Sequence, residues 1–307
     1  IITLIFFSSL SKKNLFRLSI FLFFISLFLL FLVPIIGTEV KGSKRWIDLF
    51  FLPRFQPIEL VKPFTIIFLA TILSSEKNIH IYYKYFLSFI AIVPISFLLM
   101  IQPDIGQTLL IFLSWLTLVF ISGISLMVFL TFFGISLSSL LYMVFFVPKF
   151  FYIKNRILSF LNPSTGTYNF QSEKAIDAIA SGGYFGKGIG EGTLKNRVPE
   201  AHTDYIVSVI SEEFGVVVII LLLILFLLFI YTVFKKIYLE ENEKTKLVLA
   251  GTITLIISQA LIHLGVNIRL FPTTGMTLPF LSYGGSSIIG VSILSGIILN
   301  LTKRKVN

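Results

Sequence analysis

The longest uncharged stretch of the chain reads IGQTLLIFLSWLTLVFISGISLMVFLTFFGISLSSLLYMVFFVP and covers residues 105–148. A helix needs about 20 apolar residues to cross the hydrocarbon core of a bilayer, so this stretch is long enough for two crossings. Ser122 and Gly123 lie near its middle. Ser-Gly pairs favour turns, so we expect the chain to reverse there. The stretch therefore predicts a pair of transmembrane helices.

Similar apolar runs recur on both sides of this pair. The clearest cover Leu18–Ile36, Phe86–Ile101, Phe214–Phe234, Leu247–Ile268 and Met276–Thr302, with a shorter one at Pro63–Leu73. Residues 1–10 add an apolar stub that is too short to cross. We expect an all-α fold, a polytopic integral membrane helix bundle of about eight complete spans plus a partial one. The chain begins at Ile1 rather than Met, so we expect that residues 1–307, a single membrane domain, have lost sequence before the stub.

The composition excludes several classes of protein. The chain is 56% hydrophobic and only 13% charged, which is too apolar for a soluble domain of this size. It has no Cys, which excludes a catalytic thiol, a thiolate-bound zinc, an iron–sulfur cluster and disulfides. The net charge of +10 comes from basic residues in short loops between apolar runs. Such loops suit anionic lipid headgroups, so we expect contact with membrane lipid and no nucleic-acid partner.

Alternation of the spans assigns the loops to two sides of the membrane. One side carries short basic loops and a basic tail, which include Lys12, Lys84, Lys235 and Lys303. Short loops rich in Lys and Arg remain in the cytoplasm. Residues 149–205 then form one large extracytoplasmic loop within the membrane domain.

The first charged cluster follows the span that ends at Ile36. Ionisable side chains beside membrane spans are costly, so each is a functional candidate. Pro57 suits the first turn of a helix, and Glu59 and Lys62 would then share one face of it. They are either a self-compensating ion pair or a charged pair that lines a polar cavity. Arg45, beside a Trp, is either an interface anchor or a phosphate-binding guanidinium.

Two further segments carry carboxylates at the start of an apolar run. Asp104 follows a Gln-Pro break, and helix capping would explain it. Glu200, His202 and Asp204 lie close together directly before the run that starts at Ile206. Capping by Asp204 would not require the other two side chains, so this density favours function. A carboxylate here would act as a general base on a hydroxyl group or bind a divalent cation.

Two Gly-rich segments remain. Residues 181–190 match neither Walker nor dinucleotide-binding spacing and follow no predicted strand, so they predict a flexible surface loop whose backbone approaches a ligand. Residues 282–287 read Ser-Tyr-Gly-Gly-Ser-Ser. These small residues indicate close helix packing or, with the breaks at Pro272 and Pro279, the start of a helix that lines a cavity.

Five motifs, in order along nearly the whole chain, resemble those of the FtsW/RodA family, the SEDS (shape, elongation, division and sporulation) glycosyltransferases. They are Arg45-Trp46, Gln56-Pro57-x-Glu59-x-x-Lys62, Gln102-Pro103-Asp104-x-Gly106, Pro199-Glu200-Ala201-His202-Thr203-Asp204 and Ser282-Tyr283-Gly284-Gly285-Ser286-Ser287. The family has ten spans, so the resemblance implies that the first and part of the second are missing here. Ala201 and the Thr274–Pro279 segment are similar to the division branch rather than the elongation branch. Ile58 and Thr274 depart from the usual Ser and Lys of the family.

The resemblance implies a peptidoglycan glycosyltransferase, a hexosyltransferase of septal cell-wall synthesis. Its substrate would be lipid II, the undecaprenyl-pyrophosphate-linked disaccharide-pentapeptide, which it would join to the growing glycan strand. The active site would face outward from the bacterial cytoplasmic (inner) membrane, at the division septum. Implied partners are a class B penicillin-binding protein, which supplies transpeptidation, and other divisome proteins.

The resemblance also implies roles for individual residues. Asp204 would be the general base, facing a cluster in which Arg45 and Lys62 stabilise the pyrophosphate and Glu59 orients Lys62. The other predicted substrate-binding residues are Asp104, Glu200, His202, Ser282, Tyr283 and Gly284. The sequence identifies no cofactor with certainty. A divalent cation such as Mg²⁺ or Mn²⁺, held by Asp104 and Asp204, is left open.

Three alternatives belong beside this reading. A flippase or transporter of the same lipid would also have broken helices and charges near its spans, but its path should have polar groups at the midplane as well. A scaffold that recruits division proteins would leave the outward carboxylates without a role. An elongation enzyme of the same family would perform the same chemistry at another place in the cell.

Overall fold

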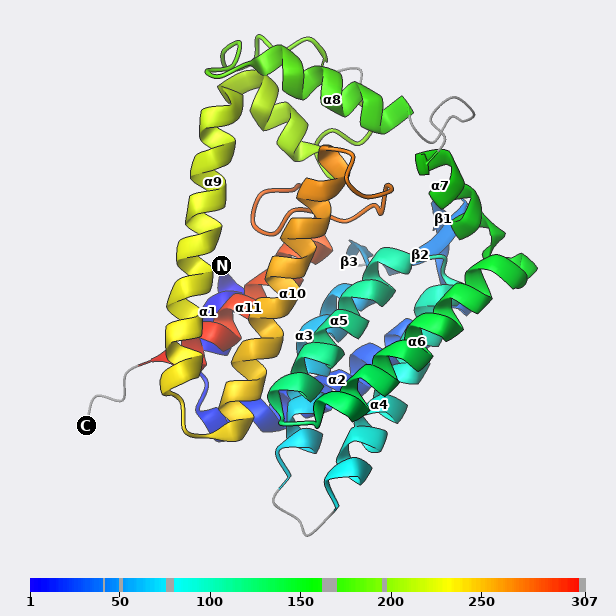
Figure 1. Cartoon of the computed structure of the whole chain (residues 1–307). Helices are drawn as coiled ribbons and strands as arrows, with labels where there is room; N and C mark the ends of the chain where they lie inside the picture. The colour runs from blue at the N-terminus through cyan, green and yellow to red at the C-terminus, as the bar shows by residue number, and fades with distance from the viewer. Residues whose placement is uncertain (41, 50–51, 76–79, 162–169, 195–197, 304–307) are drawn as a thin grey trace. The chain divides into compact units, whose positions relative to one another are not determined.

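The computed structural model describes residues 1–307 except 41, 50–51, 76–79, 162–169, 195–197 and 304–307. Helices dominate the described residues (Figure 1). They are α1 (Ile2–Ser9), α2 (Lys12–Ile36), α3 (Pro57–Leu73), α4 (Ile81–Ile101), α5 (Ile105–Ile121), α6 (Leu126–Phe146), η1 (Pro148–Phe150), α7 (Phe151–Leu161), α8 (Phe170–Gly182), α9 (Ile206–Leu239), α10 (Glu243–Asn267) and α11 (Gly285–Thr302). The described residues of the large predicted loop therefore include the helices α7 and α8.

Within the described part of the chain, six helices are long and apolar enough to cross a membrane: α2, α4, α6, α9, α10 and α11. The helices α3 and α5 have 17 residues each. At 1.5 Å per residue they are about 26 Å long, slightly shorter than a hydrocarbon core of about 30 Å. With the short α1, these helices correspond to the predicted spans. The predicted polytopic helical membrane fold is confirmed.

The uncharged stretch at residues 105–148 forms α5 and α6, as predicted. The turn between them lies at Ser122–Ser125, where Gly123 adopts a left-handed φ of 86° that other residues rarely reach. Asp104 caps α5 by accepting a hydrogen bond from the backbone N–H of Gln107 at 3.4 Å. At the other end, α6 stops before Pro148, because a helix rarely continues into the residue before a proline.

The predicted span Met276–Thr302 is wrong at its start. The helix α11 begins only at Gly285, and residues 268–284 form an irregular connection from α10. Pro272 and Pro279 each lack a backbone N–H and disfavour helix in the preceding residue. Gly275 adds a left-handed φ of 72° between them. The sequence shows both prolines, but the apolar side chains after Met276 extend the hydrophobic run and favoured a start that is too early.

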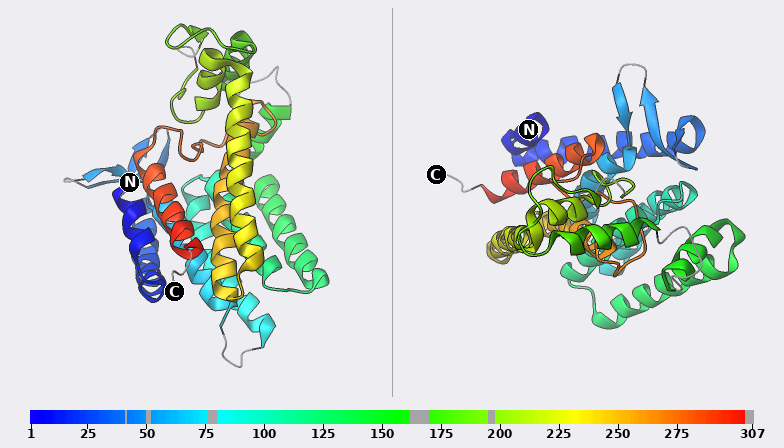
Figure 2. Two further views of the ribbon diagram at one scale, coloured as in Figure 1. Left: turned by 90° about the vertical axis from the view of Figure 1, so that its left-hand side faces the viewer. Right: turned by 90° about the horizontal axis from the view of Figure 1, so that it is seen from above.

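The chain divides into two compact units. Unit 1 comprises residues 1–124, 230–258 and 284–307. In unit 1, α2 packs on α3, α4 packs on α5, and α1 lies beside α11 (Figure 2). The central helix is α3, which contacts α2, α4, α5 and α11. A small antiparallel sheet of β1 (Thr38–Val40), β2 (Ser43–Leu49) and β3 (Leu52–Phe55) connects α2 to α3.

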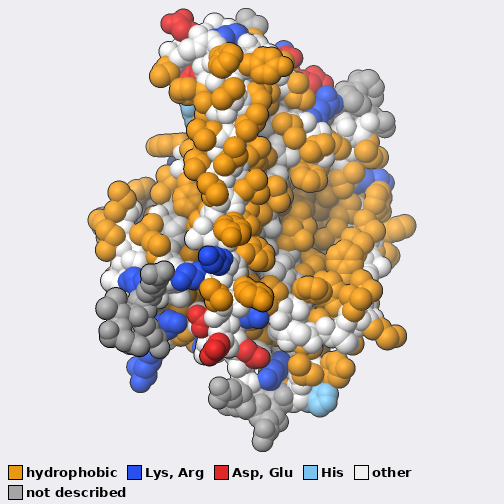
Figure 3. All heavy atoms as spheres, turned by 60° about the vertical axis from the view of Figure 1, so that its left-hand side comes forward, with side chains coloured by type: hydrophobic (Ala, Val, Ile, Leu, Met, Phe, Trp, Pro, Cys, Tyr) orange, Lys and Arg blue, Asp and Glu red, His pale blue; other side chains and the backbone are white. Residues whose placement is uncertain are grey.

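Unit 2 comprises residues 125–229 and 259–283. It contains α6, η1, α7, α8, the first part of α9, the last part of α10 and most of the irregular connection. The helix α9 is kinked at Gly215, whose φ of 78° and ψ of 178° are not helical. Hydrophobic side chains form a continuous column over α9 (Figure 3). Only 6% of its most apolar stretch is buried, so this face suits lipid.

The predicted Gly-rich loop, residues 181–190, continues to residue 194 in the structure, and residues 182–194, called the Gly-rich segment from here on, pack against the kink of α9. The backbone N–H groups of Lys187 and Gly188 donate to the carbonyls of Glu212 (2.9 Å) and Glu213 (3.0 Å). The N–H group of Val216 donates to the carbonyl of Gly183 at 3.0 Å. The glycines make room for this contact with α9. The expectation that this backbone approaches a ligand stays a prediction.

Candidate functional site

The first part of the site lies at the start of α3. Pro57 occupies the first turn, as predicted, and Glu59 and Lys62 follow on one helical face. Lys62 Nζ lies 2.8 Å from Glu59 Oε1, and the two residues are only 1% and 3% exposed. Gln107 Nε2 of α5 donates to the same Glu59 oxygen at 3.0 Å. The predicted ion pair is present, and it is buried among polar side chains of two helices.

The second part is the turn between α4 and α5. Gln56 Nε2 donates to Asp104 Oδ2 at 3.1 Å, in addition to the capping bond from Gln107. Arg45 Nε lies 3.8 Å from the same carboxylate oxygen and donates to the carbonyl of Gln102 at 3.1 Å. Arg45 also donates to the carbonyl of Pro103. Burial raises the pKa of Asp104, and the Arg45 guanidinium opposes this shift.

These side chains form one group, which we call the unit 1 cluster: Arg45, Gln56, Glu59, Lys62, Asp104 and Gln107. The start of α11 closes it, because Ser286 Oγ accepts a hydrogen bond from the backbone N–H of Gln56 at 2.9 Å. Gly290 faces Glu59, and a Cβ there would lie 2.6 Å from the Glu59 carbonyl oxygen. Gly290 therefore allows α11 to pack closely on the start of α3, while the two readings of residues 282–287 stay predictions.

A polar cavity of about 250 Å³ lies beside the unit 1 cluster. It is lined by the ends of α2 and α4 and by the turn between β1 and β2: Pro34, Glu39, Gly42, Ser43, Lys44, Ile101, Gln102 and Pro103. Arg45 follows Lys44 on β2 and binds the carbonyls of Gln102 and Pro103. Arg45 is thus fixed by two residues that line the cavity, although its own side chain is not part of the lining.

The third part, in unit 2, is the turn that carries Asp204. The carbonyl of Glu200 accepts hydrogen bonds from the N–H groups of Thr203 and Asp204, both at 3.1 Å. Glu200 adopts a left-handed φ of 58°, uncommon for a residue with a side chain. Thr203 Oγ1 donates to Glu200 Oε2 at 3.1 Å. The side chain of His202 is exposed and that of Asp204 half-buried, directly before α9.

The irregular connection holds this turn from the other side. Ser282 Oγ donates to the carbonyl of Thr203 at 2.7 Å and accepts from the N–H of Leu278 at 2.7 Å. The N–H of Tyr283 donates to the carbonyl of His202 at 2.9 Å, while the Tyr283 ring is 78% exposed. Gly284 is the N-cap of α11. Ser282 is therefore a structural brace of the Asp204 turn.

Three polar residues of α10, which the sequence reasoning missed, lie behind the turn. Asn267 Nδ2 donates to the carbonyl of Asp204 at 3.1 Å, and Asn267 Oδ1 accepts from the N–H of Ser208 at 3.3 Å. His263 Nδ1 lies 2.7 Å from the carbonyl of Met276. Gln259 Nε2 donates to the carbonyl of Thr277 at 2.9 Å. Their spacing of four residues in an apolar helix, which places them on one face, was the available signal.

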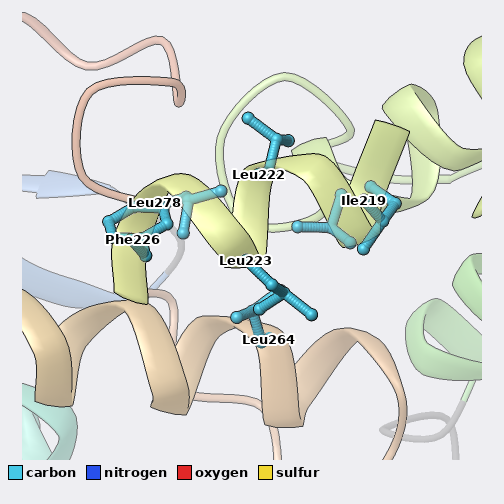
Figure 4. A pocket seen from close by; sticks show the side chains of 7 residues that line it. Ile219, Leu222, Leu223, Phe226, Leu264 and Leu278 are labelled. Atoms are coloured by element: carbon cyan, nitrogen blue, oxygen red, sulfur yellow. The ribbon is translucent and has the colours of Figure 1, made fainter. Parts of the chain in front are cut away.

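A small apolar cavity adjoins this region of unit 2 (Figure 4). Its volume is about 10 Å³, and it is lined by Val207, Ile219, Leu222, Leu223, Phe226, Leu264 and Leu278. A space of this size barely holds one water molecule, and an apolar lining offers that water no hydrogen bonds. We interpret it as imperfect packing.

The structure thus brings the predicted residues together in two groups. Arg45, Glu59, Lys62 and Asp104 meet in unit 1. Glu200, His202, Asp204, Ser282 and Tyr283 meet in unit 2. We also expected Asp204 to face the cluster around Arg45. This expectation concerns residues of two different units and stays a prediction.

The Asp104 carboxylate does not have the surroundings of a cation site. The Asp104 carboxylate accepts hydrogen bonds from Gln56 and Gln107 and lies beside the Arg45 guanidinium, which would repel a cation. Among the described residues, no group of three or more His, Asp or Glu side chains is arranged to hold a metal ion. A divalent cation held by Asp104 and Asp204 stays a prediction.

Fold and site together define a multi-pass membrane protein with a buried polar cluster and an acidic turn next to its helix ends. The family of cell cycle proteins named after FtsW, RodA and SpoVE matches residues 1–307. The chain belongs to this family, which confirms the predicted resemblance.

Curated relatives agree with this family. A protein of Caulobacter vibrioides, named "Probable peptidoglycan glycosyltransferase FtsW", is 33% identical over 97% of this chain and 75% of its own length. A protein of Coxiella burnetii with the same name is 36% identical over 92% of this chain and 77% of its own length. The enzyme class predicted from the sequence agrees with these names.

Solved structures agree as well. A chain of a peptidoglycan synthase complex that coordinates polymerization and crosslinking superposes with a TM-score of 0.81. It is 30% identical, over 97% of this chain and 84% of the other. The rod shape determining protein RodA of Thermus thermophilus gives a TM-score of 0.69 at 29% identity, over 97% of this chain and 82% of RodA.

Proposed function

We propose that this protein is a peptidoglycan glycosyltransferase that polymerises lipid II during septal wall synthesis. One observation carries the proposal: a carboxylate, Asp204, is held in a braced turn directly before a membrane-spanning helix. This is where the sugar of a lipid-anchored substrate would lie. The names of the curated relatives support the same activity.

Asp204 would act as the general base. The acceptor sugar hydroxyl loses its proton to the carboxylate while its oxygen forms a bond to the anomeric carbon of the donor. The bond from that carbon to the pyrophosphate oxygen breaks, and its electron pair leaves with the lipid pyrophosphate. Such a base must be fixed within hydrogen-bond reach of the hydroxyl. The bonds from Asn267 and Ser282 to the backbone at Asp204 and Thr203 provide that fixation.

The unit 1 cluster would bind the charged parts of the substrate. Arg45 is held by the carbonyls of Gln102 and Pro103, which line the cavity, and a guanidinium next to the cavity would suit a pyrophosphate oxygen. Lys62 is buried and paired with Glu59, so it would act through the positive potential and geometry of the cluster. Glu200, His202 and Tyr283 would contact the sugar beside Asp204.

The proposed setting follows from the same chemistry. Lipid II and the growing glycan lie on the outer face of the bacterial cytoplasmic membrane, so the Asp204 side of the protein would face outward. A class B penicillin-binding protein would crosslink the product. The solved relative in a complex that couples polymerization to crosslinking supports such a partner. The FtsW names of the relatives favour the division septum and other divisome proteins as the context.

The elongation enzyme of the same family is the second candidate. The similarity to RodA, over 97% of this chain, favours it. Both candidates perform one reaction. Depletion of the protein from growing cells separates them, since loss of a division enzyme yields filaments and loss of an elongation enzyme yields rounded cells.

The test is a polymerisation assay with the purified protein, its penicillin-binding partner and labelled lipid II in detergent. Glycan polymers in this assay identify an enzyme, because detergent micelles have no compartments between which a flippase could transport lipid. We expect Asp204→Asn to lose about 10²–10⁴-fold in rate, the usual contribution of a general base. The matched control is Asp177→Asn, on the surface of α8 and paired with Lys174. Normal polymer synthesis by the Asp204 variant would refute the assignment.

A further inference from the structure

The Gly-rich segment carries three apolar side chains that nothing in unit 2 covers among the described residues. Tyr184, Phe185 and Ile189 are 77%, 84% and 79% exposed. The proposed reaction does not use them. Exposed aromatic side chains in a row are costly in water, so their surroundings require an explanation.

The segment is rigid enough to present these side chains in fixed positions. Its backbone is bound to α9 on both sides of the kink, from the Lys187 N–H to the Glu212 carbonyl and from the Val217 N–H to the Tyr184 carbonyl. Glu212 Oε1 also accepts from the N–H groups of Thr193 and Leu194, both at 2.9 Å. A Cβ at Gly215 would collide with the Tyr184 carbonyl. The segment is therefore already ordered in the folded protein, and binding through its side chains would not incur a further entropic cost of ordering the loop.

The same hydrogen bonds fix the depth of the segment along α9. Glu212 and Glu213 are the last charges before the apolar run Phe214–Phe234. At 1.5 Å per residue this run is about 30 Å long, which matches the hydrocarbon core. The membrane boundary therefore lies close to Phe214. Tyr184, whose carbonyl binds the N–H of Val217, is level with the first turn inside that boundary.

The chemistry at this level matches the bilayer interface. Tyr and other aromatic rings collect at the headgroup level, where one end of the ring is apolar and the other is hydrated. The neighbouring charge is compensated, because Lys187 Nζ lies 3.3 Å from Glu212 Oε1. The lipid-facing surface of α9 begins beside the segment at Val216 and Val217, which are 36% and 48% exposed.

We infer that the tip of the Gly-rich segment, with Tyr184, Phe185 and Ile189, inserts into the headgroup region of the bilayer at the N-terminal end of α9. The occupant of this surface is lipid. The segment is an interfacial anchor. It fixes the height of the kinked start of α9, and with it the turn that ends at Asp204, relative to the membrane surface.

The absence of Cys from the chain makes a direct test simple. The full chain is placed in lipid nanodiscs with one spin label, at Phe185→Cys or Ile189→Cys. Collision with oxygen, which concentrates in lipid, is compared with collision with a water-soluble nickel complex. The reference positions are Asp177→Cys, 53% exposed on α8, and Ile224→Cys, 46% exposed in the middle of the α9 run.

We expect both test labels to lie between the references, with more oxygen and less nickel contact than at Asp177. Water-like values equal to those at Asp177 would overturn the inference. A label also adds apolar surface of its own, so a second variant is needed. Tyr184→Ser with Phe185→Ser, in the chain labelled at Ile189→Cys, should shift the label toward nickel contact. No shift would mean that the aromatic side chains do not anchor the segment.

A protein partner is the competing occupant. The measurement is therefore made with and without the penicillin-binding protein. Labels that collide with neither reagent when the partner is present, and are water-like without it, would show a protein contact and overturn lipid insertion. The assay does not depend on polymerisation, so its outcome and that of the proposed function can be told apart.

Discussion

Glu59 and Lys62 are charged residues buried together in the membrane domain, so each depends on the other. Removing one partner of a buried pair leaves an uncompensated charge, at a cost of about 3–5 kcal/mol. We expect Lys62→Met to lower the thermal unfolding temperature strongly in detergent. The double variant Glu59→Gln with Lys62→Met should recover much of that loss.

The control for this pair is Lys174→Met. Lys174 forms the same i, i+3 contact with Asp177 at 3.0 Å, but on the surface of α8. Exposed pairs contribute little to stability, so the unfolding temperature should barely change. Equal losses for Lys62→Met and Lys174→Met would contradict the buried pair.

A second prediction concerns Asp104 and the dependence of protein stability on pH. Burial raises its pKa in the folded protein above the ordinary value of 3.8. Above pH 3.8 the unfolded chain releases this proton before the folded protein does. The stability that Asp104 contributes is thus complete below pH 3.8 and is lost as the pH rises through the raised folded pKa.

We expect Asp104→Asn to flatten the pH dependence of the unfolding temperature above pH 3.8, because Asn also caps helices but does not titrate. Arg45→Met should have the opposite effect. Arg45 holds the pKa of Asp104 down, and its loss extends the falling region to higher pH. Identical pH profiles for the wild type and both variants would exclude Asp104 as the titrating group.

Among the elements, α10 reaches the proposed base through Asn267. This side chain is fully buried and donates to the backbone of Asp204. A displacement of about 1 Å at a reacting group costs about 10²-fold in rate. If Asp204 is the base, Asn267→Ala should lower kcat by that order and leave the KM for lipid II nearly unchanged.

Asn300→Ala is the matched control. Asn300 is also buried in a membrane helix, and its amide donates to the carbonyls of Phe7 and Ser8 at 3.0 and 3.2 Å. Its loss should lower stability without lowering kcat per folded molecule. If Asn267→Ala has a normal kcat while Asp204→Asn is inactive, the positioning role of Asn267 is rejected and the role of Asp204 as the base is not.

A further prediction concerns the effect of glycine substitutions on stability, at the kink of α9 and within α6. Gly215 has a left-handed φ, and a Cβ there meets the Tyr184 carbonyl, so Gly215→Ala should destabilise the protein by at least about 1–2 kcal/mol. Gly134 in α6 has open space around it. Gly134→Ala should stabilise by about 0.5–1 kcal/mol through helix propensity. Thermal unfolding of the two variants measures this opposite sign.

Local contacts were predictable at the scale of elements, and distant ones were not. The turn at Ser122–Ser125 and the Glu59–Lys62 pair follow from spacing within one segment. Gln107 joins Glu59 across 48 residues, and Asn267 joins Asp204 across 63. No local pattern encodes such partners. The start of α11 was predicted too early, because the apolar residues after Met276 extend the hydrophobic run although the breaks at Pro272 and Pro279 were recognised.

For the whole molecule, the charges around the spans predict which side faces the cytoplasm. The short connection from α9 to α10 is flanked by Lys235, Lys236, Lys244 and Lys246. Such loops stay in the cytoplasm, so the opposite end of α9, with Asp204, should face outward. This orientation is required if the substrate is reached from the outer leaflet.

Single cysteines on either side of α9 test this orientation in intact cells. Asp177→Cys, on α8, should react with a membrane-impermeant maleimide added outside. Glu241→Cys, in the exposed connection between α9 and α10, should react only after the membrane is permeabilised. The span α9 separates the two positions, so each is the other's control. Labelling of Glu241→Cys in intact cells, with Asp177→Cys protected, would place Asp204 inside. The protein could not then polymerise lipid II on the outer face of the membrane. Asp204 and its neighbours would instead have to act on the same lipid from the cytoplasmic side.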